Sequence, residues 1–212
     1  MTPASRVSTG IPLLDPILGG GFPGGSLVCL LTDSMSNAEV FLYHFSGTRE
    51  TVFFVTDQGP EEQETRMRDL GLQTASVRFL GGARGRYLIE PEMKKIREEG
   101  KSLNIVVNTF SSWVETAESA EGVRKLLARL RETVASTGSV ALLFFYRGTH
   151  PKDIENLVVN SCDVVMSIES RMEARGLETT LSIPKIRGMS PIQSLRVVVG
   201  ERIVIDTTRQ IA

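Results

Sequence analysis

The sequence predicts an α/β fold, with a mainly parallel sheet covered by helices on both faces and antiparallel strands at the C-terminus. Short runs of apolar, β-branched residues recur between residues 26 and 168, and helical patterns separate them. The runs are almost continuously apolar, which is typical of strands buried on both faces. Alternation of strand and helix favours a parallel sheet. The strand patterns after residue 176, in contrast, follow one another with no helix between them.

Each predicted element has its own signal in the sequence. The strands of the alternating part are expected at 26–32, 51–56, 103–109, 139–145 and 163–168. Helices are expected at 37–45, 60–71, 91–100, 119–136 and 151–160. The fourth helix is the clearest, because its apolar residues form one stripe, made of Val123, Leu126, Leu127, Leu130 and Val134.

Glycines and prolines mark the ends of these helices. Gly71 and Gly100 stand where C-terminal caps are expected, and prolines stand where a first turn tolerates them, at Pro60, Pro91 and Pro151. In the tail, strands are expected at 177–186, 193–199 and 202–207. The segment "VGER" at 199–202 predicts a hairpin turn, so we expect the sheet to finish antiparallel.

The composition is that of an ordinary globular domain. The chain has 212 residues, of which 41% are hydrophobic and 23% are charged, and its formal net charge is -1. This length is most simply one domain, spanning residues 1–212. The near-neutral charge gives no general attraction to nucleic acid or to a membrane surface.

No pattern indicates a metal site or a membrane segment. Cys29 and Cys162 each lie inside an apolar run, and neither His44 nor His150 has a cysteine at metal-ligand spacing. We therefore expect two buried free thiols, no metal and a cytoplasmic location. The first ten residues contain no apolar core, and the sequence has no run of about 18 apolar residues, so neither a signal peptide nor a membrane span is expected.

The most specific motif is the opening segment "STGIPLLDPILGGGFPGGSLV" at 8–28. It closely resembles the segment before the phosphate-binding loop in the KaiC-like and RadA-like branch of the RecA superfamily, with the pattern T-G-x-x-x-L-D-x-x-L-G-G-G-[IF]-P-x-G. The matching residues are Thr9, Gly10, Leu14, Asp15, Leu18, Gly19, Gly20, Gly21, Pro23 and Gly25. The resemblance implies a RecA-like ATPase core with a three-layer fold, and the strand and helix patterns agree with it.

The loop expected after this segment differs from the family's phosphate-binding loop. Counted from Gly25 without a gap, the pattern G-x-x-x-x-G-K-[ST] falls on Thr32, Asp33, Ser34, Met35, Ser36, Asn37, Ala38 and Glu39. In such loops, backbone N–H groups and the lysine hold the phosphates, and the hydroxyl holds Mg²⁺. Both glycines, the lysine and that hydroxyl are missing here. By this resemblance, the nucleotide loop is degenerate.

The residues that replace the pattern also oppose phosphate binding. Asp33 and Glu39 place carboxylates where phosphate charge is expected, and like charges about 4 Å apart repel by roughly 4 kcal/mol at an effective dielectric constant of about 20. Ser36 or Asn37 is expected to cap the following helix, with Glu39 in its first turn. The alternative is that Glu39 ligates Mg²⁺ in place of the missing hydroxyl.

Two further family positions indicate the same loss. In the family, acidic residues at the end of the second core strand activate water, and this sequence offers Asp57 and Gln58. Asp57 is either a remnant base or a turn-capping aspartate. The Walker B aspartate should end "NIVVN", where Asn108 lacks the charge that orients Mg²⁺. We therefore predict no catalytic residue, no metal and no cofactor, with ATP and Mg²⁺ bound only under the alternative.

One family position is intact. Lys185 and Arg187 in "PKIRG" match the family's K-x-R-G, whose basic residues reach the nucleotide of the neighbouring subunit. They predict either a finger supplied in trans to an active partner or a solvated basic edge of a strand.

Signals for nucleic-acid binding are weak. The segment "GGARGR" at 81–86 carries Arg84 and Arg86 without interleaved aromatic residues. The segment "FYRGTHPKD" at 145–153 is too short to predict a DNA-contacting loop. Trp113, which follows the Walker B strand, is expected in the core rather than at a partner contact.

The sequence therefore predicts a catalytically inactive RecA/KaiC-like subunit with a regulatory or scaffolding role. Its expected partners are a second copy of itself or an active RecA/KaiC-like relative. Two alternatives stay open. One is a divergent ATPase that uses Glu39 and Asp57 to bind Mg²⁺, and the other is a DNA-repair accessory similar to recombinase paralogues.

Overall fold

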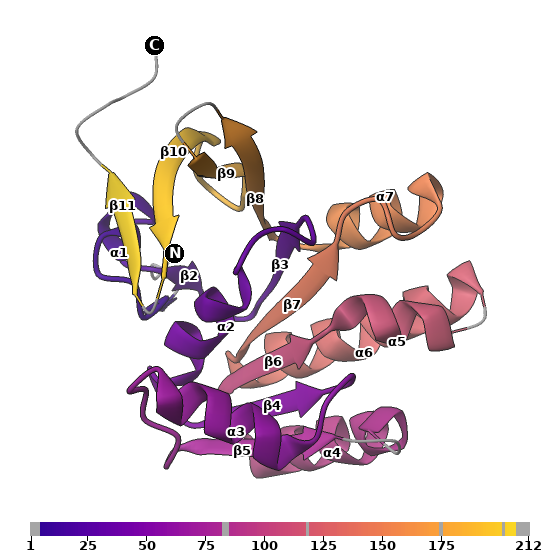
Figure 1. Ribbon diagram of the computed structural model, residues 1–212. Helices are drawn as coiled ribbons and strands as arrows, with labels where there is room; N and C mark the ends of the chain where they lie inside the picture. The colour runs from indigo at the N-terminus through magenta and orange to yellow at the C-terminus, as the bar shows by residue number, and fades with distance from the viewer. Residues whose placement is uncertain (1–4, 82–84, 118, 174–175, 201, 207–212) are drawn as a thin grey trace.

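The central element of the structure is a nine-stranded sheet with the strand order β11-β10-β9-β8-β3-β7-β6-β4-β5 (Figure 1). The computed structural model describes residues 5–81, 85–117, 119–173, 176–200 and 202–206. The strands of this sheet are β3 (Ser26–Thr32), β4 (Thr51–Val55), β5 (Val77–Gly81), β6 (Asn104–Asn108), β7 (Val140–Tyr146), β8 (Val164–Glu173), β9 (Gly176–Ile186), β10 (Ile192–Val199) and β11 (Ile203–Asp206). A separate antiparallel pair joins β1 (Arg6–Val7) to β2 (Phe22–Pro23).

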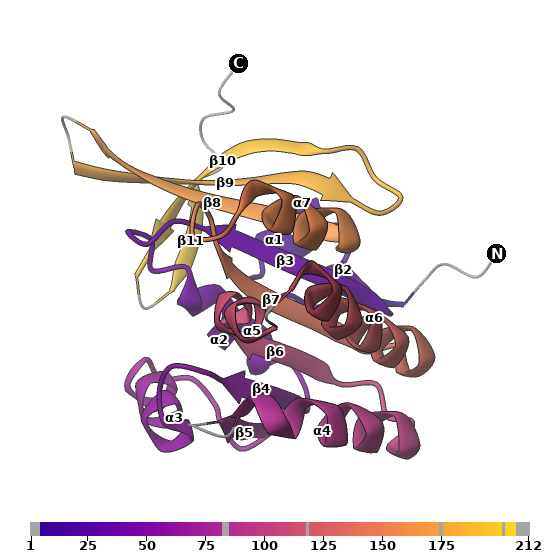
Figure 2. The ribbon, with the colours of Figure 1, turned by 90° about the vertical axis from the view of Figure 1, so that its right-hand side faces the viewer.

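The direction of the strands changes at β8. From β8 to β5 every neighbouring pair in the sheet is parallel, with β3 between β7 and β8. On its other side β8 pairs with β9 in antiparallel fashion, and β9, β10 and β11 continue as antiparallel hairpins. The ends of β8 and β9 project beyond the rest of the sheet (Figure 2). The predicted mainly parallel sheet that finishes antiparallel is confirmed.

Helices cover both faces of the sheet and make the fold three layers deep (Figure 2). One face carries α1 (Leu14–Ile17), α2 (Glu39–Ser46) and α3 (Pro60–Asp69). The other face carries α4 (Gly85–Glu99), α5 (Phe110–Thr116), α6 (Ala120–Thr137) and α7 (Lys152–Ser161). The parallel strands all end on the same side of the sheet. The loops that follow β3, β4, β6 and β7 therefore lie together at the C-terminal ends of these strands.

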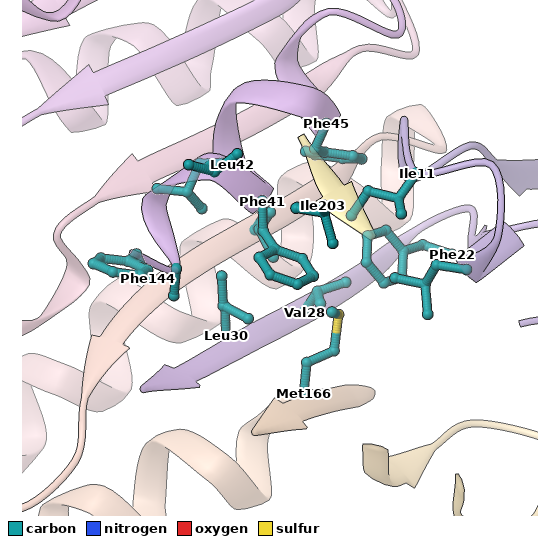
Figure 3. Packing of buried hydrophobic residues seen from close by; sticks show 14 of the residues in the cluster. Ile11, Phe22, Val28, Leu30, Phe41, Leu42, Phe45, Phe144, Met166 and Ile203 are labelled. Carbon is teal, nitrogen blue, oxygen red and sulfur yellow. The ribbon is translucent and has the colours of Figure 1, made fainter. Parts of the chain in front are cut away.

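Two buried clusters hold the layers together, one on each face of the sheet. Between α2 and β3, the side chains of Phe41 and Phe45 pack against Val28 and Leu30 (Figure 3). On the other face, the Trp113 ring lies 5.2 Å from the Phe54 ring, and Trp113 is 2% exposed. Because β3 and α2 are both anchored in the core, the loop between them is held at both ends.

Several elements differ from the sequence prediction, which did not include β1, α1 or β2. The helix expected at 91–100 begins at Gly85, so Pro91 lies inside α4 rather than in its first turn. Burial of Ile89, Met93 and Ile96 on one stripe outweighs the hydrogen bond that the proline removes. β5 was not predicted, because this short edge strand is only half-buried and its apolar pattern is weak.

The helix α5 was also missed, and a side-chain cap explains why it forms. Its sequence, "FSSWVET", is short and contains two serines, so it has no helical stripe. The hydroxyl of Thr109 accepts a hydrogen bond from the backbone N–H of Ser112 at 3.3 Å and so caps the first turn. Burial of Phe110 and Trp113 then fixes the helix on the sheet.

The opening motif fixes the conformation of the N-terminal segment and packs it closely against α2. Both the backbone N–H and the hydroxyl of Thr9 donate to Oδ1 of Asp15 at 2.7 Å, and the Ser8 hydroxyl donates to Oδ2 at 2.6 Å. Gly10 has a φ of 77°, and a Cβ atom there would lie 2.2 Å from the carbonyl oxygen of His44 in α2. The motif residues therefore have a structural task in this chain that involves no phosphate.

We expect Gly10→Ala to lower the free energy of unfolding by about 2 kcal/mol, because a β-carbon brings both left-handed backbone strain and a collision with backbone. Gly71→Ala is a matched control, since Gly71 has a φ of 71° with no atom within 4 Å of the added Cβ. Urea denaturation of both variants should show a smaller loss for the control, about 1 kcal/mol from left-handed backbone strain alone. Equal losses of stability in the two variants would contradict the close packing of Gly10 against α2.

Candidate functional site

The residues in the place of the phosphate-binding loop join β3 to α2. Thr32 ends β3, residues 33–38 form the loop, and Glu39 is the first residue of α2. The Asp33 carboxylate accepts a hydrogen bond from the backbone N–H of Met35 at 2.9 Å and another from that of Ser170, in β8, at 2.8 Å. Asp33 thus ties the loop sideways to the neighbouring strand.

The predicted cap of α2 is wrong. Ala38 occupies the N-cap position, and no side chain caps the helix. The Ser36 hydroxyl bonds back to the Thr32 hydroxyl and to the carbonyl oxygen of Asp33, so it is used within the loop instead. Asn37 is exposed. Glu39 does lie in the first turn of α2, as predicted.

A cleft of about 460 Å³ opens beside this loop. Its lining residues come from the loop, the start of α2, α3, the end of β7 and the residue after β10. It is lined by Ser34, Ser36, Asn37, Glu39, Val40, Tyr43, Arg66, Leu70, Phe144, Tyr146 and Gly200. Of the two loop carboxylates that were expected to oppose phosphate, only Glu39 is among these residues.

Glu39 is held in place by Tyr43, one turn further along α2. The Tyr43 hydroxyl donates to Oε2 of Glu39 at 2.7 Å. Burial raises the pKa of Tyr43 above its ordinary value, and the charge of Glu39 raises it further. Burial also raises the pKa of Tyr146, with added contributions from the charges of Glu39 and Asp57. The two tyrosines therefore remain protonated beside the Glu39 carboxylate.

The second-strand and Walker B positions lie, like the cleft, at the C-terminal ends of the parallel strands. Oδ1 of Asp57 accepts hydrogen bonds from the hydroxyls of Thr56 at 2.9 Å and Ser112 at 2.7 Å. Both donors are side chains, so the choice between a turn-capping aspartate and a remnant base stays a prediction. Gln58, the next residue, is half-buried. Asn108 ends β6, as predicted, and its Nδ2 donates to Oε1 of Gln63 in α3 at 3.2 Å.

These amides form an incompletely satisfied group. Among the described residues, three buried amide atoms have no hydrogen-bond partner: Oδ1 of Asn108, Nε2 of Gln63 and Oε1 of Gln58. Unpaired polar atoms inside a protein cost free energy. The edge where a Walker B aspartate would orient a cation is therefore built from neutral amides.

Lys185 and Arg187 lie at the opposite end of the strands, where the parallel strands begin. Lys185 pairs with Val165 at the start of β8, and its Nζ donates to the carbonyl oxygen of Asn160 at 2.9 Å. Arg187 pairs with Asp163 at 3.3 Å and donates to the carbonyl oxygen of Gly24 at 3.4 Å. Both cations are bonded within their own chain, and their action in trans stays a prediction.

Of the two basic segments considered as contacts for nucleic acid, the structure describes the side chains of only one. Arg84 lies outside the described residues, and so does the side chain of Arg86. In the segment 145–153, the Arg147 guanidinium bonds to the Ser167 hydroxyl and pairs with Glu169 at 3.2 Å, while the His150 ring stacks on Phe145 at 5.2 Å. Both side chains are engaged within the chain, and contact of this segment with nucleic acid stays a prediction.

Several residues of the cleft were not found by sequence reasoning. Tyr43 and Tyr146 carry no motif, although the spacing of Tyr43 four residues after Glu39 is compatible with an i,i+4 contact on a helix. Ser170 is 137 residues from Asp33, so no local pattern connects them. Arg66 lies on the exposed side of α3 and reads as an ordinary charged residue.

The described residues contain neither a candidate membrane span nor a candidate metal cluster. In the ranges given above, no helix is both long enough and apolar enough to span a membrane. Within the same parts of the chain, no group of three or more His, Cys, Asp or Glu side chains is placed to hold a metal ion.

Comparison with known proteins places the fold and the family. The crystal structure of KaiC-like protein PH0186 from the hyperthermophilic archaeon Pyrococcus horikoshii OT3 matches with a TM-score of 0.79 and 18% sequence identity, over 96% of this chain and 99% of that chain. At this identity the match shows the fold, which is a KaiC-like RecA fold. No curated protein matches the sequence. The model of one family matches residues 6–212, and the chain belongs to that family, the family of unknown function DUF7125.

Proposed function

We propose that this protein is a RecA/KaiC-like subunit without ATPase activity, which regulates or scaffolds an assembly through protein–protein contacts. One observation carries the proposal: the loop at 32–39 has no glycine and no lysine, and its Asp33 carboxylate is bonded to β8. Its partners are a second copy of the chain or an active RecA/KaiC-like relative. In this proposal residues 1–212 act as one domain in the cytoplasm.

The loop chemistry supports the loss of phosphate binding. A phosphate-binding loop needs glycines to turn its backbone N–H groups toward the phosphates and a lysine to neutralise their charge. Here Asp33 instead accepts the N–H of Met35, which removes one donor from the loop. Glu39 adds a negative charge to the cleft, and a phosphate about 4 Å away would be repelled by roughly 4 kcal/mol at an effective dielectric constant of about 20.

The chemistry of Mg²⁺ supports the same proposal. Mg²⁺ needs near-octahedral oxygen ligands, which carboxylates and phosphates commonly provide. Oε2 of Glu39 accepts a hydrogen bond from Tyr43, and Oδ1 of Asp57 accepts hydrogen bonds from two hydroxyl groups. Asn108, at the Walker B position, has no charge to offer the metal. No observation favours the alternative in which Glu39 and Asp57 bind the metal together.

Isothermal titration of ATP and ADP with Mg²⁺ tests the proposal. We expect no saturable heat, corresponding to a Kd weaker than about 1 mM, and no phosphate release. Saturable binding would contradict the loss of the nucleotide site. In that case Glu39→Gln and Asp57→Asn decide between a metal-dependent site, which both variants weaken, and a metal-free one.

The role as a subunit is tested by sedimentation velocity over a range of protein concentrations. A mass that rises with concentration supports contact between copies of the chain. A monomer at every concentration would exclude the second copy as the partner and leave an active relative.

A further inference from the structure

The charged side chains that line the cleft are one carboxylate and one cation. Glu39 lines it, and Asp57 lies near enough to act on Tyr146 through its charge. The one cation among the lining residues is Arg66, which pairs with Glu62 at 3.1 Å. Because Arg66 is paired with Glu62, Glu39 has no cationic partner among the lining residues apart from the partial positive charge at the N-terminus of α2.

The apolar lining of the cleft is largely aromatic. Phe144 and Tyr146 come from the end of β7 with their rings 5.2 Å apart in an edge-to-face arrangement, and Tyr43 comes from α2. The faces of aromatic rings attract cations, especially where water is partly excluded. A carboxylate beside aromatic rings is a common way to bind an organic cation.

Glu39 is oriented and still has acceptor capacity. Its bond from Tyr43 uses Oε2, and an ionised carboxylate offers about four lone-pair sites over its two oxygens. The carboxylate therefore stays fixed by its neighbour while Oε1 remains free to accept from a ligand. The volume of about 460 Å³ lies in the range of small-molecule sites.

We propose that the cleft binds an organic cation, an alkyl guanidinium or alkyl ammonium group, with Glu39 as its counter-ion and the half-buried ring of Tyr146 beside its body. This inference rests on the proposed function, because a cleft that held nucleotide phosphate would have no room for such a ligand. The cation has two sources, a free small molecule or a basic side chain of another protein.

The test is calorimetric titration with agmatine and, separately, with a blocked tripeptide that has a central arginine. We expect at least one probe to bind with a Kd below about 1 mM and to lose tenfold or more in affinity in Glu39→Gln. That variant keeps an oxygen that can accept from Tyr43 while it removes the charge. Glu121→Gln, on the exposed start of α6, is the matched control and should bind as the wild type does.

Binding of agmatine assigns the site to a free cation, and binding of the tripeptide alone assigns it to a protein partner. If neither probe binds, or if Glu39→Gln binds as tightly as the wild type, the inference is overturned. The ATP titration separates the two proposals. Failure of the cations together with failure of ATP removes only this inference, whereas tight ATP binding removes the proposed function as well.

Discussion

Trp113→Ala is expected to lower the free energy of unfolding by about 3–5 kcal/mol, the usual cost of removing a large buried aromatic side chain. Trp113 is 2% exposed, and its ring packs edge-to-face on Phe54 and lies 6.0 Å from the Phe110 ring. The substitution leaves a cavity beneath α5, on the face of the sheet opposite α2. Chemical denaturation monitored by far-UV circular dichroism measures the loss.

Trp113→Phe provides the matched comparison. It retains an aromatic ring between Phe54 and Phe110, so we expect less than half of the loss caused by alanine. A loss below about 1 kcal/mol for Trp113→Ala would contradict the packed position and would restore the interpretation of Trp113 as a partner contact. ATP and agmatine titrations of the phenylalanine variant should match those of the wild type, since Trp113 does not line the cleft.

The fold was largely predictable because its strands are buried on both faces. A strand such as β3 is apolar at nearly every position, and that signal does not depend on distant residues. Prediction was wrong where tertiary burial outweighed a local rule. Pro91 indicated the start of a helix, but the buried stripe of α4 continues through it. The capped helix α5 and the half-buried strand β5 lacked periodic patterns.

The candidate site was predictable in position but not in its bonding. The resemblance located residues 32–39 at the turn from β3 to α2, where the structure has them. The contact from Asp33 to Ser170 joins strands that are adjacent only in the folded sheet, so local sequence contains no sign of it. The capping role given to Ser36 was wrong because its hydroxyl has nearer acceptors inside the loop.

The motif and the loop have separable tasks, which bears on what the resemblance can imply. Thr9 and Asp15 fix the turn before α1 through hydrogen bonds, and Gly10 lets the N-terminal segment pack closely against the backbone of α2. Those contacts are needed whether or not a nucleotide binds. A sequence can therefore match the motif and the fold of an ATPase family while its phosphate loop has a different chemistry.

The ion-pair centre at Asp163 gives the second large effect expected in this protein. Asp163 directly precedes β8, and its side chain is 10% exposed. Oδ2 accepts from the backbone N–H of Leu27 at 2.9 Å and pairs with Arg131 at 3.1 Å. Oδ1 pairs with Arg187 at 3.3 Å. One carboxylate thus joins β3, α6 and the residue after β9, at the end of the parallel strands that lies opposite the cleft.

We expect Asp163→Ala to lower the free energy of unfolding by about 3 kcal/mol. Breaking a buried ion pair costs about 3–5 kcal/mol, and the value is placed at the low end because both arginines are partly exposed and keep contact with water. Glu121→Ala is the control, since its pair with Arg124 spans 3.8 Å between exposed side chains and should contribute less than about 0.5 kcal/mol. Equal stability losses in urea denaturation would contradict the role of Asp163. A large loss for Asp163→Ala alone would show that the Asp163 carboxylate stabilises the fold, and any action of Arg187 in trans must compete with its bond to this carboxylate.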